Sequence, residues 1–104
     1  MVTIKQVRDD LRDIRYYYSK KDIFDSASVK IVQNEVVEKV KRYNAAISKA
    51  PPRLYDLYLA LYTQNNTQAA LSYEWDFSPD YIKELNLALC QFLLDFFNDK
   101  NKGV

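Results

Sequence analysis

The stretch that decides the fold runs from Thr67 to Leu85, TQAALSYEWDFSPDYIKEL. Its first residue, threonine, is a preferred helix N-cap and predicts a short helix over residues 68–75. Further along, Ser78-Pro79-Asp80 combines a capping residue, a proline at the first helical position and an acid in the first turn, so a second helix should span residues 79–98. Between them, Asp76 can adopt a left-handed backbone. The sequence therefore predicts two helices that cross at a sharp turn.

Packing of these two helices can also be anticipated. We expect small Ala70 on the packed face of the first helix, because small residues let short helices cross closely. Ile82 and Leu85 should turn inward from the second helix. Trp75 should cover this small core.

Seven residues of the segment follow a known pattern: Thr67, Gln68, Leu71, Phe77, Ser78, Tyr81 and Ile82. With these residues the segment resembles the C-terminal helix-turn-helix of sigma-70 family factors, from which it departs at Trp75 and Asp76. The whole chain is similar in size and layout to small ArpU-like regulators of phages that infect Gram-positive bacteria. The resemblance implies transcriptional regulation through contact with double-stranded DNA or RNA polymerase.

Upstream of this segment the chain also has helical patterns. Pro51-Pro52 ends one helix and begins another whose buried side lies within 54–62. Before it, apolar residues at helical spacing predict a helix from Ser26 or Ser28 to about Lys49. The same spacing and a capping box predict another helix from Thr3 to residues 19–21, and the charged residues between its apolar positions should face solvent. We therefore expect an all-α single domain over residues 1–104 with about five helices: a helical hairpin over residues 3–49, or alternatively a coiled-coil dimer seam, and a helix-turn-helix half over residues 51–98.

The composition argues against an enzyme. The chain has no histidine, one cysteine and one glycine, so the usual proton shuttle, a cysteine-rich metal site and a phosphate-cradling glycine loop are excluded. The carboxylate pairs Asp9/Asp13, Asp22/Asp25 and Glu35/Glu38 lie among lysines and arginines and are expected to be solvated. We expect no catalytic residues, metal or cofactor.

Charge is unevenly distributed. Residues 1–53 hold twelve Lys and Arg against seven Asp and Glu, a net charge of +5, whereas residues 54–104 hold three against seven, a net charge of −4. The longest apolar stretch, residues 85–97, is interrupted by Gln91 and Asp95 and is too short to span a bilayer. We expect a cytoplasmic protein, in the host bacterial cytosol if it is phage-encoded, that does not bind membranes.

The second helix of the predicted helix-turn-helix supplies the candidate contact residues. Its outward face should carry Asp80, Lys83, Glu84 and Gln91, which would meet the DNA groove or polymerase. Because one lysine cannot supply much phosphate affinity, Lys41, Arg42, Lys49 and Arg53 are the sequence-nearest candidates for phosphate contacts. The alternative is a structural, assembly or protein-interaction module, such as a phage packaging or adaptor protein, with a degenerate helix-turn-helix.

A second apolar stripe on the same helix has two interpretations. It consists of Leu87, Cys90, Leu94 and Phe97. Either the N-terminal hairpin covers it, or it forms an interface in a homodimer. Tyr16-Tyr17-Tyr18 cannot all be buried, because consecutive helical residues point about 100° apart.

Overall fold

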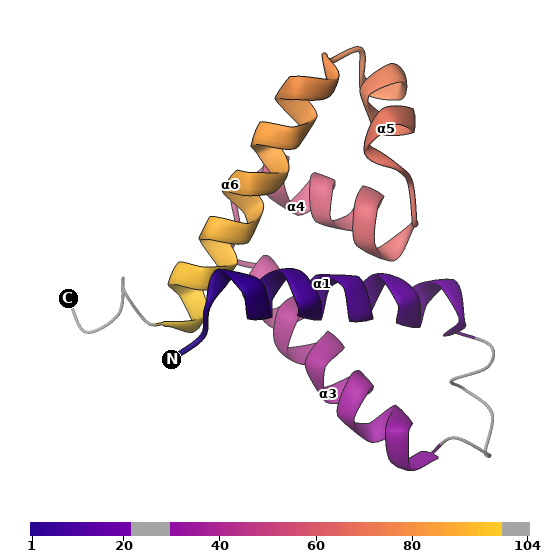
Figure 1. The fold of residues 1–104 in the computed structure, drawn as a ribbon, viewed down its shortest axis with the longest axis vertical. Coiled ribbons are helices and arrows are strands. Elements are labelled where there is room, and N and C mark those ends of the chain that lie inside the picture. The colour runs from indigo at the N-terminus through magenta and orange to yellow at the C-terminus, as the bar shows by residue number, and fades with distance from the viewer. Residues whose placement is uncertain (22–29, 99–104) are drawn as a thin grey trace.

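The computed structural model describes residues 1–21 and 30–98, with side chains from residue 35 onward in the second range. Within these ranges the fold is all-α, as predicted, and contains no strand (Figure 1). The elements are α1 (Ile4–Ser19), α3 (Lys30–Ile47), α4 (Pro52–Tyr58), the π-helix η2 (Leu59–Thr63), α5 (Gln68–Trp75) and α6 (Pro79–Phe97). The predicted start of the second helix, near Ser26 or Ser28, lies outside the described residues.

The elbow between α5 and α6 confirms the central prediction. Asp76 has φ 57° and ψ 43°, a left-handed backbone. The N–H of Phe77 donates to the carbonyl of Ser72 at 3.0 Å, and that of Asp76 donates to the carbonyl of Tyr73 at 3.3 Å. These two bonds form a Schellman motif, which satisfies carbonyls at the end of α5 and lets the chain reverse. The chain then enters α6 at an angle to α5 (Figure 1).

Hydroxyl side chains cap the N-termini of α5 and α6, the helices on either side of this elbow. The Thr67 hydroxyl accepts from the Ala70 N–H at 3.0 Å, and the Ser78 hydroxyl accepts from the Tyr81 N–H at 3.1 Å. Each bond satisfies an N–H that has no partner inside its helix. At the N-terminus of α1, Thr3 and Gln6 form the predicted reciprocal capping box. The capping residues read from the sequence therefore set three helix starts.

Two packing expectations for the helix-turn-helix need correction or refinement. Ala70 is exposed, and the small buried residue of α5 is Ser72, whose hydroxyl donates to the Ala69 carbonyl at 3.0 Å. The hydroxyl can be buried because this backbone bond satisfies it. Trp75 is partly buried and meets the Phe77 ring edge-on, with ring centroids 6.4 Å apart.

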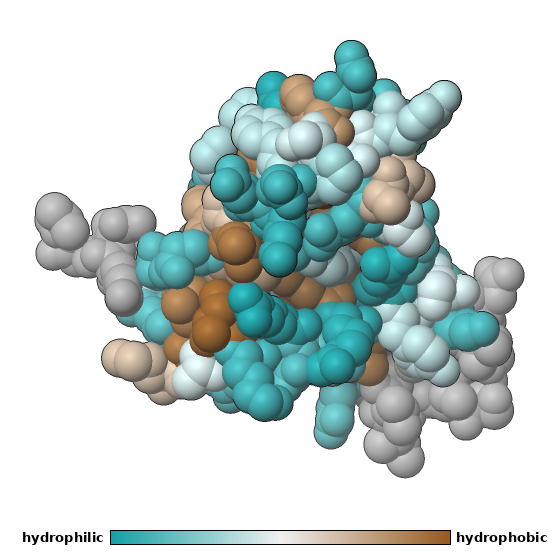
Figure 2. Space-filling view, turned by 45° about the horizontal axis from the view of Figure 1, so that its top comes forward, coloured by the Kyte–Doolittle hydropathy of each residue, from teal (hydrophilic) through white to brown (hydrophobic). Residues whose placement is uncertain are grey.

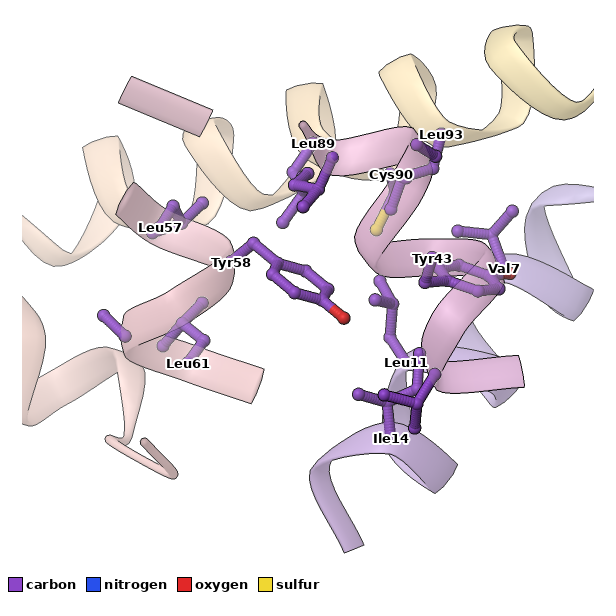
Figure 3. Packing of buried hydrophobic residues seen from close by; sticks show 14 of the residues in the cluster. Val7, Leu11, Ile14, Tyr43, Leu57, Tyr58, Leu61, Leu89, Cys90 and Leu93 are labelled. Carbon is purple, nitrogen blue, oxygen red and sulfur yellow. The ribbon is translucent and has the colours of Figure 1, made fainter. Parts of the chain in front are cut away.

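One hydrophobic cluster joins all the elements. Val7, Leu11 and Ile14 line the inner side of α1, and Leu89 and Leu93 face them from α6. Figure 3 shows the Tyr58 ring reaching from α4 into the middle of these side chains. α1 packs against η2 and α6 as well as α3, so the two N-terminal helices share one core with the C-terminal half.

A π-helical turn that was not predicted from the sequence follows α4. Leu59–Thr63 continues the helix with wider turns, and the Gln64 N–H donates to the Leu59 carbonyl at 2.9 Å. The Thr63 hydroxyl donates to the same carbonyl at 2.7 Å. The segment then ends at Asn65, whose backbone is left-handed with φ 60°. This wide turn places Tyr62 against α6, where its hydroxyl donates to Asn86 at 2.6 Å.

A polar network fastens α1 to α3. Asp10 accepts a hydrogen bond from the Tyr43 hydroxyl at 2.7 Å and pairs with Lys39 at 3.1 Å. Lys39 also pairs with Asp13 at 2.8 Å. Partial burial lowers the pKa of Lys39, but its bonds to Asp13 and Asp10 outweigh that effect and raise the pKa overall. The charged residues on this side of α1 therefore bind α3.

The start of the described chain is tied to the end of α6. The Val2 N–H donates to the Asn98 side-chain oxygen at 2.8 Å, and the Asn98 amide donates back to the Val2 carbonyl at 2.9 Å. Figure 1 shows α1 starting beside the end of α6 and running away from it. In residues 1–21 and 30–98, each helix is too short or too polar to pass through a bilayer.

Candidate nucleic-acid interface

The outer face of α6 carries the residues predicted to meet a partner. Asp80, Lys83, Glu84 and Gln91 are all exposed. They lie opposite the buried side of the helix, which contains Ile82, Leu89 and Leu93. The described part of the chain therefore leaves this polar face of the second helix open.

A cleft runs between α1 and α6 beside this face. It has a volume of about 500 Å³ and is lined by residues of four elements. Three arginines come from α1 and one lysine from α6. Figure 2 shows one face of the molecule, on which hydrophilic side chains surround smaller areas of hydrophobic surface. The lining residues are Arg8, Leu11, Arg12, Arg15, Tyr62, Gln68, Lys83, Asn86, Leu87 and Cys90.

None of the lining residues is acidic, so positive charge dominates the cleft. Arg12 pairs with Asp9, which also pairs with Lys5 at 2.9 Å. Arg15 donates to the side-chain and backbone oxygens of Asn65, both at 3.3 Å. In the described parts of the chain, no carboxylate forms an ion pair with Arg8, Arg15 or Lys83.

The base of the cleft is rigid and neutral. Tyr62 and Asn86 are joined by the hydrogen bond described above, and burial raises the pKa of Tyr62 to about 12. Cys90 is only 2% exposed, and burial raises the pKa of its thiol although the nearby Arg8 guanidinium opposes this shift. Both groups are therefore protonated at neutral pH and do not offset the charge of the cations.

The residues predicted to touch phosphates do not gather at this site. Arg42 lies over the rings of Tyr43 and Phe97, with its guanidinium carbon 5.8 and 5.9 Å from their centroids. Phe97 is at the far end of α6 from Asp80, about 25 Å along the helix axis. The fold therefore places Arg42 near the C-terminal end of α6 and outside the cleft, so it does not lie with Lys83 as its proximity in sequence suggested.

The other three predicted cations are exposed but separate from the cleft. Lys41 and Lys49 lie on α3 and just after it, and neither lines the cleft. Arg53 lies near the elbow, with its guanidinium carbon 5.0 Å from the Phe77 centroid. Proximity in sequence was the only basis for grouping these residues, and none of the three lines the cleft that contains Lys83.

The apolar stripe on α6 is largely an internal contact. Cys90 is in the core, so its assignment to an interface between copies is wrong. Leu94 and Phe97 are partly buried against the core, and the Phe97 ring lies 4.7 Å from that of Tyr43 on α3. Only Leu87, which is 46% exposed, remains on the surface. The N-terminal helices cover this stripe because α1 and α3 both pack on α6.

A second cavity of about 360 Å³ lies on the other side of η2. Its walls include Tyr18, Asn44, Tyr55 and Tyr58, and none of its lining residues is charged. The Tyr58 hydroxyl donates to Asn44 at 2.8 Å, and Asn44 donates to the Tyr18 hydroxyl at 3.3 Å. Among the described residues there is no group of three or more side chains suited to hold a metal ion.

The arginines of α1 are the candidate site residues that sequence reasoning missed. Arg8, Arg12 and Arg15 were expected on a solvated face, together with the neighbouring aspartates. Their spacing of four and then three residues places them on one side of a helix, while Asp10 and Asp13 point to α3. That spacing was the available signal, but the sequence does not show that this side faces α6.

Comparison with protein-family models, curated proteins and solved structures gave no match for this chain.

Proposed function

We propose that this protein binds double-stranded DNA through the helix-turn-helix formed by α5 and α6, and acts as a small regulator of transcription. The observation that carries the proposal is the open polar face of α6, held at a fixed angle by the Asp76 elbow, with a cationic cleft along its side. A helix-turn-helix binds DNA by laying its second helix in the major groove while neighbouring groups contact the backbone. In this protein the outer face of α6 would enter the groove, and the cations of the cleft would contact the backbone.

The geometry suits a major groove. An α-helix with its side chains is about 10–12 Å across, and the groove of B-DNA is about 12 Å wide. With the outer face of α6 turned to the base edges, Lys83 and the α1 arginines lie to one side of the helix, where a phosphate strand borders the groove. Gln91 and Glu84 would reach base edges, since amides pair with adenine and carboxylates accept from cytosine.

A second candidate function is contact with a protein, such as RNA polymerase or an assembly partner. The observation that favours it is the pair of carboxylates, Asp80 and Glu84, on the outer face of α6, because these repel phosphates. Tyr73 on α5 is 90% exposed, and tyrosine is enriched at protein interfaces. The same face of the molecule would then bind a protein and no DNA.

The test is a binding assay that compares two surface alanines. Ala88 lies on the exposed side of α6, and Ala45 lies on the exposed side of α3. We would replace each by glutamate, so that size and charge change equally, and measure the fluorescence anisotropy of a labelled duplex of about two helical turns at low salt. Circular dichroism would verify that both variants keep their helix content.

DNA binding by α6 predicts that Ala88→Glu weakens the complex at least about tenfold, which corresponds to 1.4 kcal/mol. Ala45→Glu should bind as the wild type does. If the wild type gives no anisotropy change at micromolar protein and low salt, the DNA proposal is wrong and the protein-contact function takes its place. Equal losses in both variants would show that α6 is not the contacting helix.

A further inference from the structure

We propose that the cleft between α1 and α6 is a phosphate-binding site, formed by Arg8, Arg12 and Lys83, and that it takes phosphodiester groups of the DNA backbone. The assignment of the phosphate to DNA rests on the proposed function. The phosphate chemistry of the cleft rests on its own residues. It makes the N-terminal helix part of the binding site, a role that neither the sequence pattern of the helix-turn-helix nor its resemblance assigns.

Shape and position favour a site over a patch of surface charge. The four cations belong to two helices that are far apart in sequence, and they line one hollow of about 500 Å³. Three of the lining side chains are held by hydrogen bonds within the protein: Tyr62 donates to Asn86, and Arg15 donates to Asn65. These bonds fix the backbone and side chains around the cleft before any ligand enters, so little ordering would be lost on binding.

Charge repulsion is the second argument. The lining contains four cations and no carboxylate, and within residues 1–21 and 30–98 only Arg12 among these cations forms an ion pair, with Asp9. Like charges that share a partly enclosed space destabilise the fold that brings them together. An anion in the cleft would relieve this repulsion. The chain has fourteen acidic residues, and none of those in the described ranges lines the cleft.

The donors match a phosphate better than a carboxylate or chloride ion. Guanidinium groups present paired N–H donors that fit two phosphate oxygens at once. Arg8 and Arg12 lie one helical turn apart on α1, and Lys83 faces them from α6 as a third, point-like charge. The amides of Gln68 and Asn86 add neutral donors at the edge. This set can surround a tetrahedral anion from two sides.

The test uses inorganic pyrophosphate and duplex DNA as separate probes. The variant is Arg8→Gln/Arg12→Gln, which leaves the Arg15–Asn65 bonds intact. The matched control is Lys41→Gln/Lys49→Gln, which removes the same charge from α3 and its end. Thermal unfolding would be followed in about 10 mM pyrophosphate and in sodium chloride of equal ionic strength, so that a difference reports specific binding and not general screening.

We expect pyrophosphate to raise the Tm of the wild type and the control by several degrees relative to chloride, and to leave the Arg8→Gln/Arg12→Gln variant unchanged. We also expect that variant alone to lose at least tenfold in DNA affinity. An equal pyrophosphate response in all three proteins, or none in the wild type, would overturn the phosphate site. If Arg8→Gln/Arg12→Gln loses the pyrophosphate response but binds DNA as the wild type does, the cleft is a phosphate site for a free anion and not for the DNA backbone. Absence of DNA binding in the wild type would refute the proposed function, and the pyrophosphate response would still decide the cleft.

Discussion

The dependence of DNA binding on salt follows from the number of cations in the cleft. A protein that neutralises phosphates releases condensed counterions, so log K falls with log salt by about 0.9 for each phosphate contact. Arg8, Arg12 and Lys83 together give a slope of about −2.7 if each meets one phosphate. Raising the salt fourfold, from about 50 to about 200 mM, should then weaken wild-type binding about 40-fold.

Removing two of these three cations should reduce the slope to about a third. For Arg8→Gln/Arg12→Gln we expect about −0.9, so the same rise in salt should weaken binding only about 3.5-fold. The Lys41→Gln/Lys49→Gln control carries the same net charge and should keep the wild-type slope. Fluorescence anisotropy of a labelled duplex at five or more salt concentrations gives all three slopes. Equal slopes for the two double variants would refute the reasoning, because charge would then act through the whole molecule and not through the cleft.

Further predictions concern the elbow, the core and the buried tyrosines. Asp76→Gly should raise the free energy of unfolding by about 1 kcal/mol, because glycine adopts the left-handed backbone without steric cost. Urea denaturation would measure this change, and a loss of stability would contradict the Schellman assignment. Leu89→Ala, at a fully buried position, should cost about 2–5 kcal/mol in the same assay, and a change under about 1 kcal/mol would mean that α6 does not pack as described. Because burial raises the pKa of Tyr62 to about 12, its neutral form is favoured in the folded protein, so stability should be full below pH 10 and fall as the pH rises from 10 to 12. Tyr62→Phe should reduce that fall, and an identical decline in both proteins would place its cause elsewhere.

Local signals predicted the helices of the C-terminal half closely. Thr67 and Ser78 place their hydroxyls within reach of the N–H groups that need them, and Pro79 fits only a first turn. Asp76 was the residue best able to take a left-handed backbone between two strong helix signals. These are interactions within four residues of sequence, so they can be read without knowledge of the fold.

The candidate site depends on contacts that sequence alone does not reveal. The outer face of α6 was predictable because its own apolar stripe marks the inner face. The position of the α1 arginines was not predictable. α1 has two polar sides, and long-range packing, including the Asp10 contacts with α3, decides which of them faces α6. The position of Arg42 was not predictable for the same reason, since it lies over the rings of Tyr43 and Phe97 at the other end of α6.

The π-helical turn was also beyond prediction. Residues 59–63, LALYT, contain no proline or glycine to mark a change in helical pitch. The wider turn is stabilised by tertiary contacts, among them the Tyr62 bond to Asn86, and by the left-handed Asn65 that ends it. Such turns often occur at functional sites, and this one forms part of the cleft wall.

Mapping a bound duplex by nuclear magnetic resonance tests most directly whether α6 and α1 contact DNA together. We would titrate isotopically labelled protein with a duplex of about two helical turns and follow backbone amides and arginine side-chain signals. We expect the largest shifts at residues 80–91 and at Arg8 and Arg12, with little change at Lys41 and Lys49. Shifts confined to α3, or a spectrum that DNA leaves unchanged at low salt, would contradict the account.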